Sequence, residues 1–102
     1  MNDVKERIRK TVESDDVVLF MKGSPDFPQC GFSGRAVQVL RSCNVQFSSY
    51  DVLADEDVRQ GIKEFSNWPT IPQLYVKGEF IGGSDIILDM YEKGELQKKL
   101  GA

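Results

Sequence analysis

Histidine is absent from this chain of 102 residues. No imidazole can therefore act as a general base, as the partner of a cysteine nucleophile or as a metal ligand, which excludes a Cys-His protease mechanism. Only two cysteines are present, Cys30 and Cys43. Two cysteines without histidine cannot complete a structural zinc site of the usual Cys/His kind.

Long apolar segments are also missing. The longest apolar run, Val17–Met21, is far too short to cross a bilayer, and the chain opens on charged and polar residues instead of an apolar signal segment. We therefore expect no membrane association. We expect both thiols to be free, in a reducing compartment such as a bacterial-type cytoplasm or an organelle matrix.

Basic charge is in short supply too. Lysine and arginine number 13 against 16 acidic residues, a net charge of -3, so binding to nucleic acid through a basic surface is not expected. Hydrophobic residues make up 40% of the chain and charged residues 28%, which is typical of a globular domain. At this length, residues 1–102 are expected to form one domain.

Hydrophobic periodicity predicts short helices and strands in alternation. Helices are expected near 2–13 and 32–43, after Asp55, after the turn at 82–85, and at 95–100. Strands are expected at 17–21, 45–52, 73–76 and 79–81, the last two joined by a two-residue hairpin at 77–78. Two strands joined by a helix form a right-handed, parallel unit, whereas a hairpin is antiparallel. The order therefore predicts an α/β fold with a four-stranded mixed sheet and helices on both faces.

Cys30 stands where a loop, residues 23–28, gives way to a helix. Unpaired backbone N–H groups and the positive end of the helix dipole stabilise a thiolate at such a place, so we expect a lowered pKa and a nucleophilic sulfur. Lys22, at the end of the first strand, adds a positive charge on the same rim. An inert, buried role for Cys30 is less favoured, because no apolar periodicity includes this residue.

Neither of the usual internal partners is available to this thiol. Ser33 occupies the position where a redox Cys-x-x-Cys motif has its second cysteine. Cys43 lies on the apolar face of the same helix, roughly 20 Å away at 1.5 Å per residue, whereas a disulfide needs Cα atoms within about 7 Å. We expect Cys43 to be a core thiol. Cys30 must then exchange with an external thiol or ligate a metal or iron–sulfur cluster, and the residues alone leave both uses open.

Three motifs follow one another along the chain: Cys30-Gly31-Phe32-Ser33 with Lys22 upstream, Trp68-Pro69-Thr70-Ile71-Pro72, and Gly82-Gly83-Ser84-Asp85. Together they make the chain resemble a monothiol glutaredoxin of the CGFS type over almost its whole length. The resemblance implies a thioredoxin-like fold in which Pro72 is cis.

The resemblance also implies a glutathione site around the thiol. Lys22 and Arg59 would pair with the glycine carboxylate of glutathione, and the backbone of Ile71 would hold its cysteinyl part as an extra strand. The N–H groups of Ser84 and Asp85, at a helix N-terminus, would receive the γ-glutamyl carboxylate. The Asp85 side chain would receive the amino group of the same residue.

The residues themselves leave other roles open. Arg59 can pair with Glu56 on its own helix face, and Trp68 can serve packing instead of ligand stacking. Many members of the family have a cysteine after the Gly-Gly pair, where this chain has Ser84. A cysteine that could resolve a glutathionylated Cys30 from that position is therefore missing.

For function, the resemblance implies a 2Fe-2S cluster that bridges a homodimer, with Cys30 from each chain and two glutathione molecules as ligands. The protein would be an iron–sulfur carrier in iron homeostasis that passes the cluster to apo-proteins, and a BolA-family protein is an implied partner. The alternative is a glutathione-dependent thiol-disulfide oxidoreductase that removes glutathione from protein thiols, at most a weak enzyme.

Overall fold

The computed structural model of the protein describes residues 3–101. Its α-helices are α1 (Val4–Glu13), α2 (Gly31–Ser42), α3 (Glu56–Ser66), α4 (Ser84–Glu92) and α5 (Glu95–Leu100). Its strands are β1 (Val17–Met21), β2 (Ser48–Asp51), β3 (Gln73–Val76) and β4 (Glu79–Gly82). A short 3-10 helix, η1 (Val52–Ala54), lies between β2 and α3.

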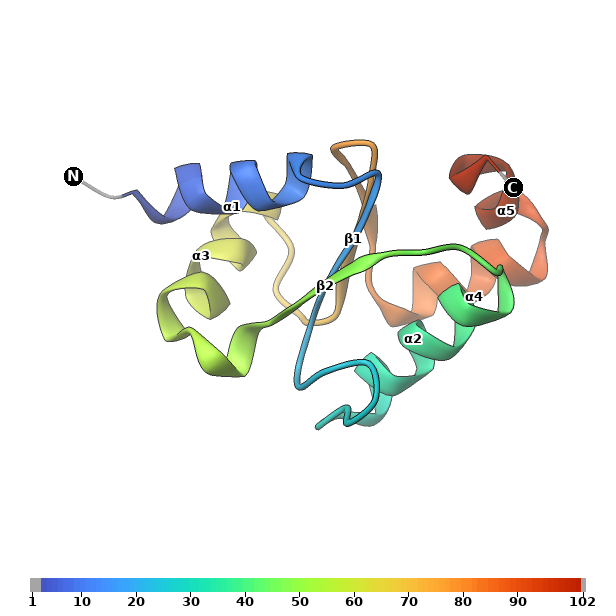
Figure 1. The fold of residues 1–102 in the computed structure, drawn as a ribbon, viewed down its shortest axis with the longest axis horizontal. Coiled ribbons are helices and arrows are strands. Elements are labelled where there is room, and N and C mark those ends of the chain that lie inside the picture. The colour runs from blue at the N-terminus through green and yellow to red at the C-terminus, as the bar shows by residue number, and fades with distance from the viewer. Residues whose placement is uncertain (1–2, 102) are drawn as a thin grey trace.

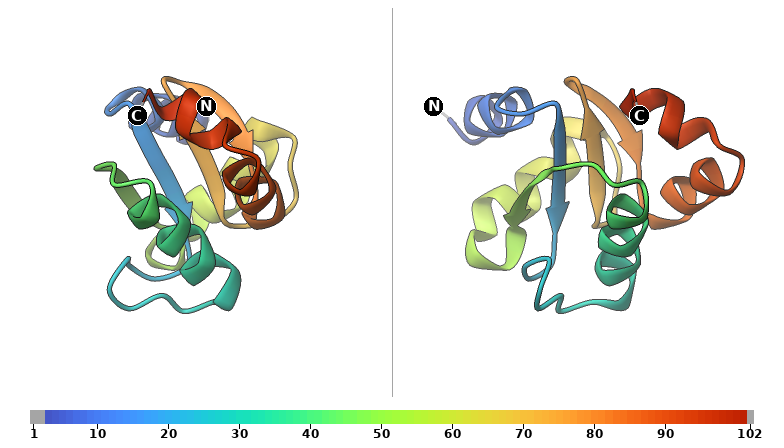
Figure 2. Two further views of the ribbon diagram at one scale, coloured as in Figure 1. Left: turned by 90° about the vertical axis from the view of Figure 1, so that its right-hand side faces the viewer. Right: turned by 45° about the vertical axis from the view of Figure 1, so that its right-hand side comes forward.

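The four strands form one mixed sheet in the order β2-β1-β3-β4 (Figures 1 and 2). β1 pairs in parallel with β2, where Val18 lies opposite Ser48, and antiparallel with β3, where Val18 lies opposite Tyr75. β3 and β4 form the predicted antiparallel hairpin. The predicted α/β fold with a four-stranded mixed sheet is therefore confirmed.

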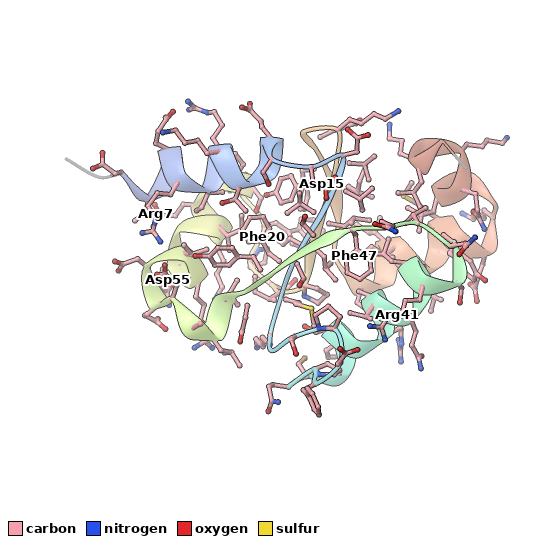
Figure 3. The ribbon with its side chains drawn as sticks, in the orientation of Figure 1. Arg7, Asp15, Phe20, Arg41, Phe47 and Asp55 are labelled. Atoms are coloured by element: carbon pink, nitrogen blue, oxygen red, sulfur yellow. The ribbon has the colours of Figure 1, made fainter. Side chains whose placement is uncertain are left out.

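Helices cover both faces of the sheet, α1 and α3 on one side and α2, α4 and α5 on the other (Figure 1 and Figure 2, right). β1 is buried along its whole length because its side chains alternate between two cores. Leu19 and Met21 join a cluster with α2, α4 and α5, whereas Val18 and Phe20 join a cluster with α1 and α3. Figure 3 shows Phe20 on the α1 and α3 side and Phe47 on the α2 side.

Asp55 ties three elements together on the α1 and α3 side. Its carboxylate accepts a hydrogen bond from the N–H of Val58 at 3.2 Å and so caps α3, as the sequence predicted. It also accepts from the hydroxyl of Tyr50 in β2 at 3.3 Å and forms an ion pair with Arg7 of α1 (Figure 3). α1 and β2 are thereby held to the start of α3.

The second strand is shorter than the predicted range 45–52. Pairing with β1 begins at Val18 and Ser48, so residues 45 and 46 would face residues 15 and 16, which precede β1. Val45 and Phe47 instead pack against the core without strand pairing. At the other end of β2, the carboxylate of Asp51 accepts from the N–H of Leu53 at 2.9 Å and starts η1, which the sequence analysis did not predict.

The helices differ from prediction by one or two residues at their ends. α4 begins at Ser84, inside the stretch 82–85 that was predicted to be a turn, because Gly83 already acts as its N-cap. Residue 2, in the first predicted helix, lies outside the described residues. Within residues 3–101, no helix is long and apolar enough to cross a membrane.

Candidate functional site

Cys30 is the N-cap of α2, in extended conformation, and its thiol is free and half-buried. The backbone N–H of Ser33 is the main cause that lowers the pKa of this thiol. The N–H of Phe32, the charge of Lys22 and the hydroxyl of Ser33 lower it further, while partial burial acts in the opposite direction. The side chain of Cys30 makes no capping hydrogen bond to α2. The N–H groups, the hydroxyl and the lysine charge lower the pKa because they stabilise the negative sulfur that forms when the proton leaves. This is the thiolate environment that the sequence predicted.

Ser33 has a structural role of its own. Its side chain is fully buried, and its hydroxyl accepts a hydrogen bond of 3.1 Å from the backbone N–H of Lys22. The backbone oxygen of Lys22 in turn accepts from the N–H of Gln29 at 2.9 Å. The backbone of Lys22, directly after β1, is thereby bonded both to Ser33 in the first turn of α2 and to Gln29, the residue before Cys30.

The loop before Cys30 is an ordered hairpin-like turn. Ser24 and Phe27 exchange backbone hydrogen bonds of 3.3 and 3.1 Å, and Gly23 bridges to Pro28. The N–H of Gly23 also donates to the carboxylate of Asp51 at 2.9 Å, which fixes the loop to the end of β2. The thiol therefore follows a segment whose backbone is held from two sides.

Cys43 caps the other end of α2. The twelve residues of the helix separate it from Cys30, and both thiols are free. Only 8% of Cys43 is exposed, it belongs to the core with α2, α4 and α5, and burial raises the pKa of its thiol. The prediction of a core thiol is confirmed.

A cleft of about 180 Å³ opens between the start of α4, the segment that precedes β3, and the first turn of α2. Its lining residues are Phe32, Trp68, Thr70, Ile71, Pro72, Gly83, Ser84, Asp85 and Ile86. The peptide bond between Ile71 and Pro72 is cis, as the resemblance implied. Cys30 lies beside the cleft, two residues before Phe32.

The predicted glutathione-site residues fall into two groups. Ile71, Ser84 and Asp85 line the cleft. Lys22 and Arg59 are not among its lining residues; Lys22 directly follows β1, and Arg59 lies in α3, which η1 separates from β2. The structure thus brings three of the five together in one cavity and leaves Lys22 and Arg59 outside its lining.

Arg59 adopts the alternative that the sequence left open. Its Nη1 forms an ion pair with Glu56 Oε1 at 3.6 Å, one turn earlier on α3. Its Nε is buried without a hydrogen-bond partner. An unsatisfied buried donor is unusual in a folded protein, and no signal in the sequence predicted it.

Several cleft residues were not predicted as site residues. Phe32 enters the lining because α2 begins directly beside the cleft, and Thr70 because it precedes Ile71. Gly83 lies at a close approach: a Cβ there would lie 3.3 Å from Nε1 of Trp68 and 3.4 Å from the backbone oxygen of Pro72. The Gly-Gly pair was the sequence signal for that approach.

Trp68 combines the two roles considered for it. Its ring packs against Phe80 with centroids 5.8 Å apart, and it also lines the cleft. Its indole Nε1 is buried without a partner, and so is the hydroxyl of Ser84, a residue that is only 8% exposed. Two unsatisfied polar atoms therefore belong to residues that line the cleft.

The start of α4 gives the cleft its electrostatic character. The first backbone N–H groups of a helix, here those of Ser84 and Asp85, have no partner within the helix and carry partial positive charge. Such a place suits a carboxylate. The site as a whole offers a polarised thiol beside a cleft that can take a small peptide-like anion.

Comparison with known proteins agrees with this geometry. The family model described as Glutaredoxin matches residues 17–81. The chain is 58% identical over 97 residues to monothiol glutaredoxin-S17 of Arabidopsis thaliana, covering 95% of this chain but only 20% of that protein. It is 55% identical over 98 residues to an uncharacterized ycf64-like monothiol glutaredoxin of Synechocystis, covering 96% of this chain and 92% of the relative.

Among solved structures, the solution structure of reduced poplar apo GrxS14 superposes with a TM-score of 0.84 at 54% identity, covering 96% of this chain and 90% of that one. Other plant relatives carry names that place them in chloroplasts or mitochondria. The matches to these relatives and to the solved structure extend over nearly the whole chain, whereas the family model ends one residue before the motif at 82–85. The chain belongs to the glutaredoxin family and, within it, to the monothiol glutaredoxins.

Proposed function

We propose that this protein is an iron–sulfur carrier that binds glutathione and shares a 2Fe-2S cluster between two copies of the chain. Each copy supplies the thiolate of Cys30, and two glutathione molecules supply the remaining two ligands. The cluster is cargo, which the dimer passes to apo-proteins. The observation that carries the proposal is a thiol with a lowered pKa and no internal partner.

The lack of an internal partner directs the thiolate outward. Ser33 cannot form a disulfide, and its hydroxyl is already engaged by the N–H of Lys22. Cys43 is buried at the far end of α2. Thiolates are the usual ligands of iron–sulfur clusters, and a half-buried thiolate at a helix start is available to one.

The cleft beside Cys30 suits glutathione. This tripeptide carries two carboxylates, an ammonium group and a thiol. One carboxylate fits the N–H groups of Ser84 and Asp85, and the exposed Asp85 carboxylate suits the ammonium group. Lys22 and Arg59 are the cations that would receive the second carboxylate, and the backbone of Ile71, which lines the cleft, would hold the cysteinyl part.

The ligand count supports sharing. A 2Fe-2S cluster needs four ligands. Among residues 3–101, no three or more cysteine, aspartate or glutamate side chains converge to hold a metal ion. The chain offers one suitable thiolate, that of Cys30, and the resemblance implies that a second copy and two glutathione molecules would complete the set.

Anaerobic reconstitution with iron, sulfide and glutathione tests the proposal. We expect a coloured protein with visible absorbance and about twice the monomer mass of 11.5 kDa in native mass spectrometry. Cys30→Ser should abolish the colour, whereas Cys43→Ser, the matched change at the buried thiol, should keep it. A colourless monomer, or a cluster retained by Cys30→Ser, would contradict the proposal.

A second candidate function rests on the lowered pKa of Cys30, which also suits disulfide exchange. The Cys30 thiolate would attack the glutathione sulfur of a glutathionylated protein, and the protein thiolate would leave and take up a proton. A free glutathione thiolate would then attack the mixed disulfide at its glutathione sulfur, which releases glutathione disulfide and the Cys30 thiol.

Reduction of a glutathione mixed disulfide, followed by the appearance of glutathione disulfide, separates the two functions. We expect slow turnover, because the chain has no resolving cysteine at position 33 or 84. Fast turnover would make the oxidoreductase the leading function. The homodimer, the recipient apo-proteins, a BolA-family partner and the cellular compartment stay predictions.

A further inference from the structure

One wall of the cleft is held by a side chain that lies behind it. Gln73, the first residue of β3, is fully buried. Its Nε2 donates to the backbone oxygens of Trp68 at 3.1 Å and of Thr70 at 3.2 Å. Both carbonyls belong to the segment that lines the cleft, whereas Gln73 itself is outside the lining.

The other end of the same amide is anchored in the core. The hydroxyl of Tyr75 donates to Oε1 of Gln73 at 3.1 Å. The carbonyls of Trp68 and Thr70 are acceptors, so the NH₂ group of Gln73 must point toward them. The hydroxyl of Tyr75 is the donor for the amide oxygen, so the amide has one consistent orientation. Burial raises the pKa of Tyr75 to about 12, so its hydroxyl keeps the proton that it donates.

Tyr75 is itself immobilised by aromatic packing. It is 2% exposed and lies edge-on to Phe20 of β1, with ring centroids 5.7 Å apart. Its ring also packs against Phe80 of β4 at 5.5 Å. The chain of hydrogen bonds from Tyr75 through Gln73 therefore links the rigid centre of the sheet to the backbone of Trp68 and Thr70.

The wall acts in turn on the start of α4. A Cβ on Gly83 would lie 3.3 Å from Nε1 of Trp68 and 3.8 Å from Oγ1 of Thr70, so the two sides of the cleft nearly touch there. A shift of the wall would change the space in front of the N–H groups of Ser84 and Asp85. It would also move the unpartnered indole N–H of Trp68 relative to the unpartnered hydroxyl of Ser84.

We propose that Gln73 is a positioning residue for the ligand of this cleft: its amide fixes the backbone of Trp68 and Thr70 and thereby sets the affinity for glutathione. The inference rests on the proposed glutathione binding. A change at Gln73 should therefore alter the affinity for glutathione and leave the reactivity of the Cys30 thiol unchanged. The residues that lower the pKa of that thiol are Ser33, Phe32 and Lys22, and Gln73 forms no hydrogen bond to any of them.

The test compares three variants with the wild type. Gln73→Met keeps the volume of the side chain and removes all three hydrogen bonds. Tyr75→Phe removes the bond to Oε1, together with the hydrogen bond between the same hydroxyl and Ser66, and leaves both wall carbonyls bonded. Gln97→Met is the matched control, because Gln97 also donates to a backbone oxygen, that of Tyr91 at 3.4 Å, but lies in α5 outside the cleft.

Glutathione affinity is measured by calorimetry or by NMR titration, and the reactivity of Cys30 by the pH dependence of its alkylation. We expect about five- to tenfold weaker binding for Gln73→Met and about twofold for Tyr75→Phe. We expect wild-type affinity for Gln97→Met. The alkylation profile of Cys30 should be the same in all four proteins. A general loosening of the fold would instead change this profile together with the affinity.

Circular dichroism and thermal unfolding establish that each variant is folded. Unchanged affinity in Gln73→Met, or an alkylation profile that shifts together with affinity, overturns the inference. If Gln73→Met does not fold, Tyr75→Phe decides, and unchanged affinity there overturns it. A wild-type protein that binds no glutathione would instead contradict the proposed function, and this inference with it.

Discussion

The backbone N–H of Lys22 donates a hydrogen bond of 3.1 Å to the hydroxyl of Ser33. Ser33 is buried and lies at the position of the second cysteine in a dithiol motif. The bond joins the residue after β1 to the first turn of α2. Both partners act on Cys30, because the charge of Lys22 and the groups of Ser33 lower the pKa of its thiol. Ser33, which stands where a dithiol motif has its resolving cysteine, thus also helps to stabilise the thiolate of Cys30.

Ser33→Ala tests the structural part of this role. The variant leaves the N–H of Lys22 without its partner in a partly buried position, so we expect a loss of about 1 kcal/mol in the free energy of unfolding. Urea denaturation measures it. Ser49→Ala, an exposed serine of β2, is the control and should change the free energy little. Equal stability of the two variants would show that the bond contributes nothing.

The thiol of Cys30 should ionise below the range of an ordinary cysteine, whose pKa is about 8.5. Iodoacetamide alkylation of Cys30 in the Cys43→Ser background, followed against pH, measures its midpoint. Lys22→Gln removes a positive charge that favours the thiolate and should raise the midpoint. The rise should be modest, because the N–H of Ser33 acts more strongly than Lys22.

Lys77→Gln is the control for that experiment, because Lys77 lies in the β3–β4 hairpin and is not among the causes of the shift. It should leave the midpoint where it is. A midpoint at or above that of a free cysteine in the Cys43→Ser protein would contradict the thiolate site.

Gly83→Ala should reduce glutathione binding without unfolding the protein. Gly83 has a φ of -93°, which alanine adopts without strain, but the new Cβ would lie 3.3 Å from Nε1 of Trp68 at the cleft. Gly34→Ala in α2 is the control, since its Cβ would make only ordinary contact with Pro28 at 3.4 Å, outside the cleft. NMR titration with glutathione measures both. Wild-type affinity in Gly83→Ala would exclude a ligand from this part of the cleft.

The Arg7–Asp55 pair should make stability depend on pH in the acid range. The side-chain hydrogen bond from Arg7 is the main cause that lowers the pKa of Asp55 in the folded protein (Figure 3). The stabilisation is therefore complete above the pKa of the unfolded chain, about 3.9, and is lost as the pH falls through the lower pKa of the folded state.

Arg7→Gln should lower the urea midpoint at neutral pH, and its difference from the wild type should shrink as the pH is lowered below about 4. Arg9→Gln, which removes the exposed pair with Glu6, is the control and should have little effect at any pH. A difference that stays constant down to the lowest pH would assign the effect of Arg7 to packing instead of charge.

Most of the fold could be predicted because its local signals agree with its tertiary packing. The apolar run Val17–Met21 became a strand buried on both faces, and Asp55 became the cap of α3. One error lies where a distant element decides. The second strand starts late because β1 has no partner for residues 45 and 46. The early start of α4 is a local difference, since the adjacent Gly83 is its N-cap.

The site was predicted less completely. The thiol at the start of α2 follows from local sequence, because a helix end acts on the residue beside it. The cleft does not, since it is assembled from three segments, and Phe32, Thr70 and Gly83 enter it only through packing. Arg59 shows the same limit, because its ion pair with Glu56 and its unpartnered Nε depend on how α3 lies against its surroundings.

By itself the sequence determined the chemistry of this protein: one polarised thiol, no resolving cysteine beside it, no histidine, and the motifs of a monothiol glutaredoxin. These follow from residue types and from distances along one chain segment, which packing cannot change. Only the tertiary structure decided that Ser33 is a buried acceptor for Lys22 and that Tyr75 and Gln73 stand behind the cleft. Such contacts join residues of different elements, and hydrogen bonds of about 3 Å exist only after the sheet and helices have assembled.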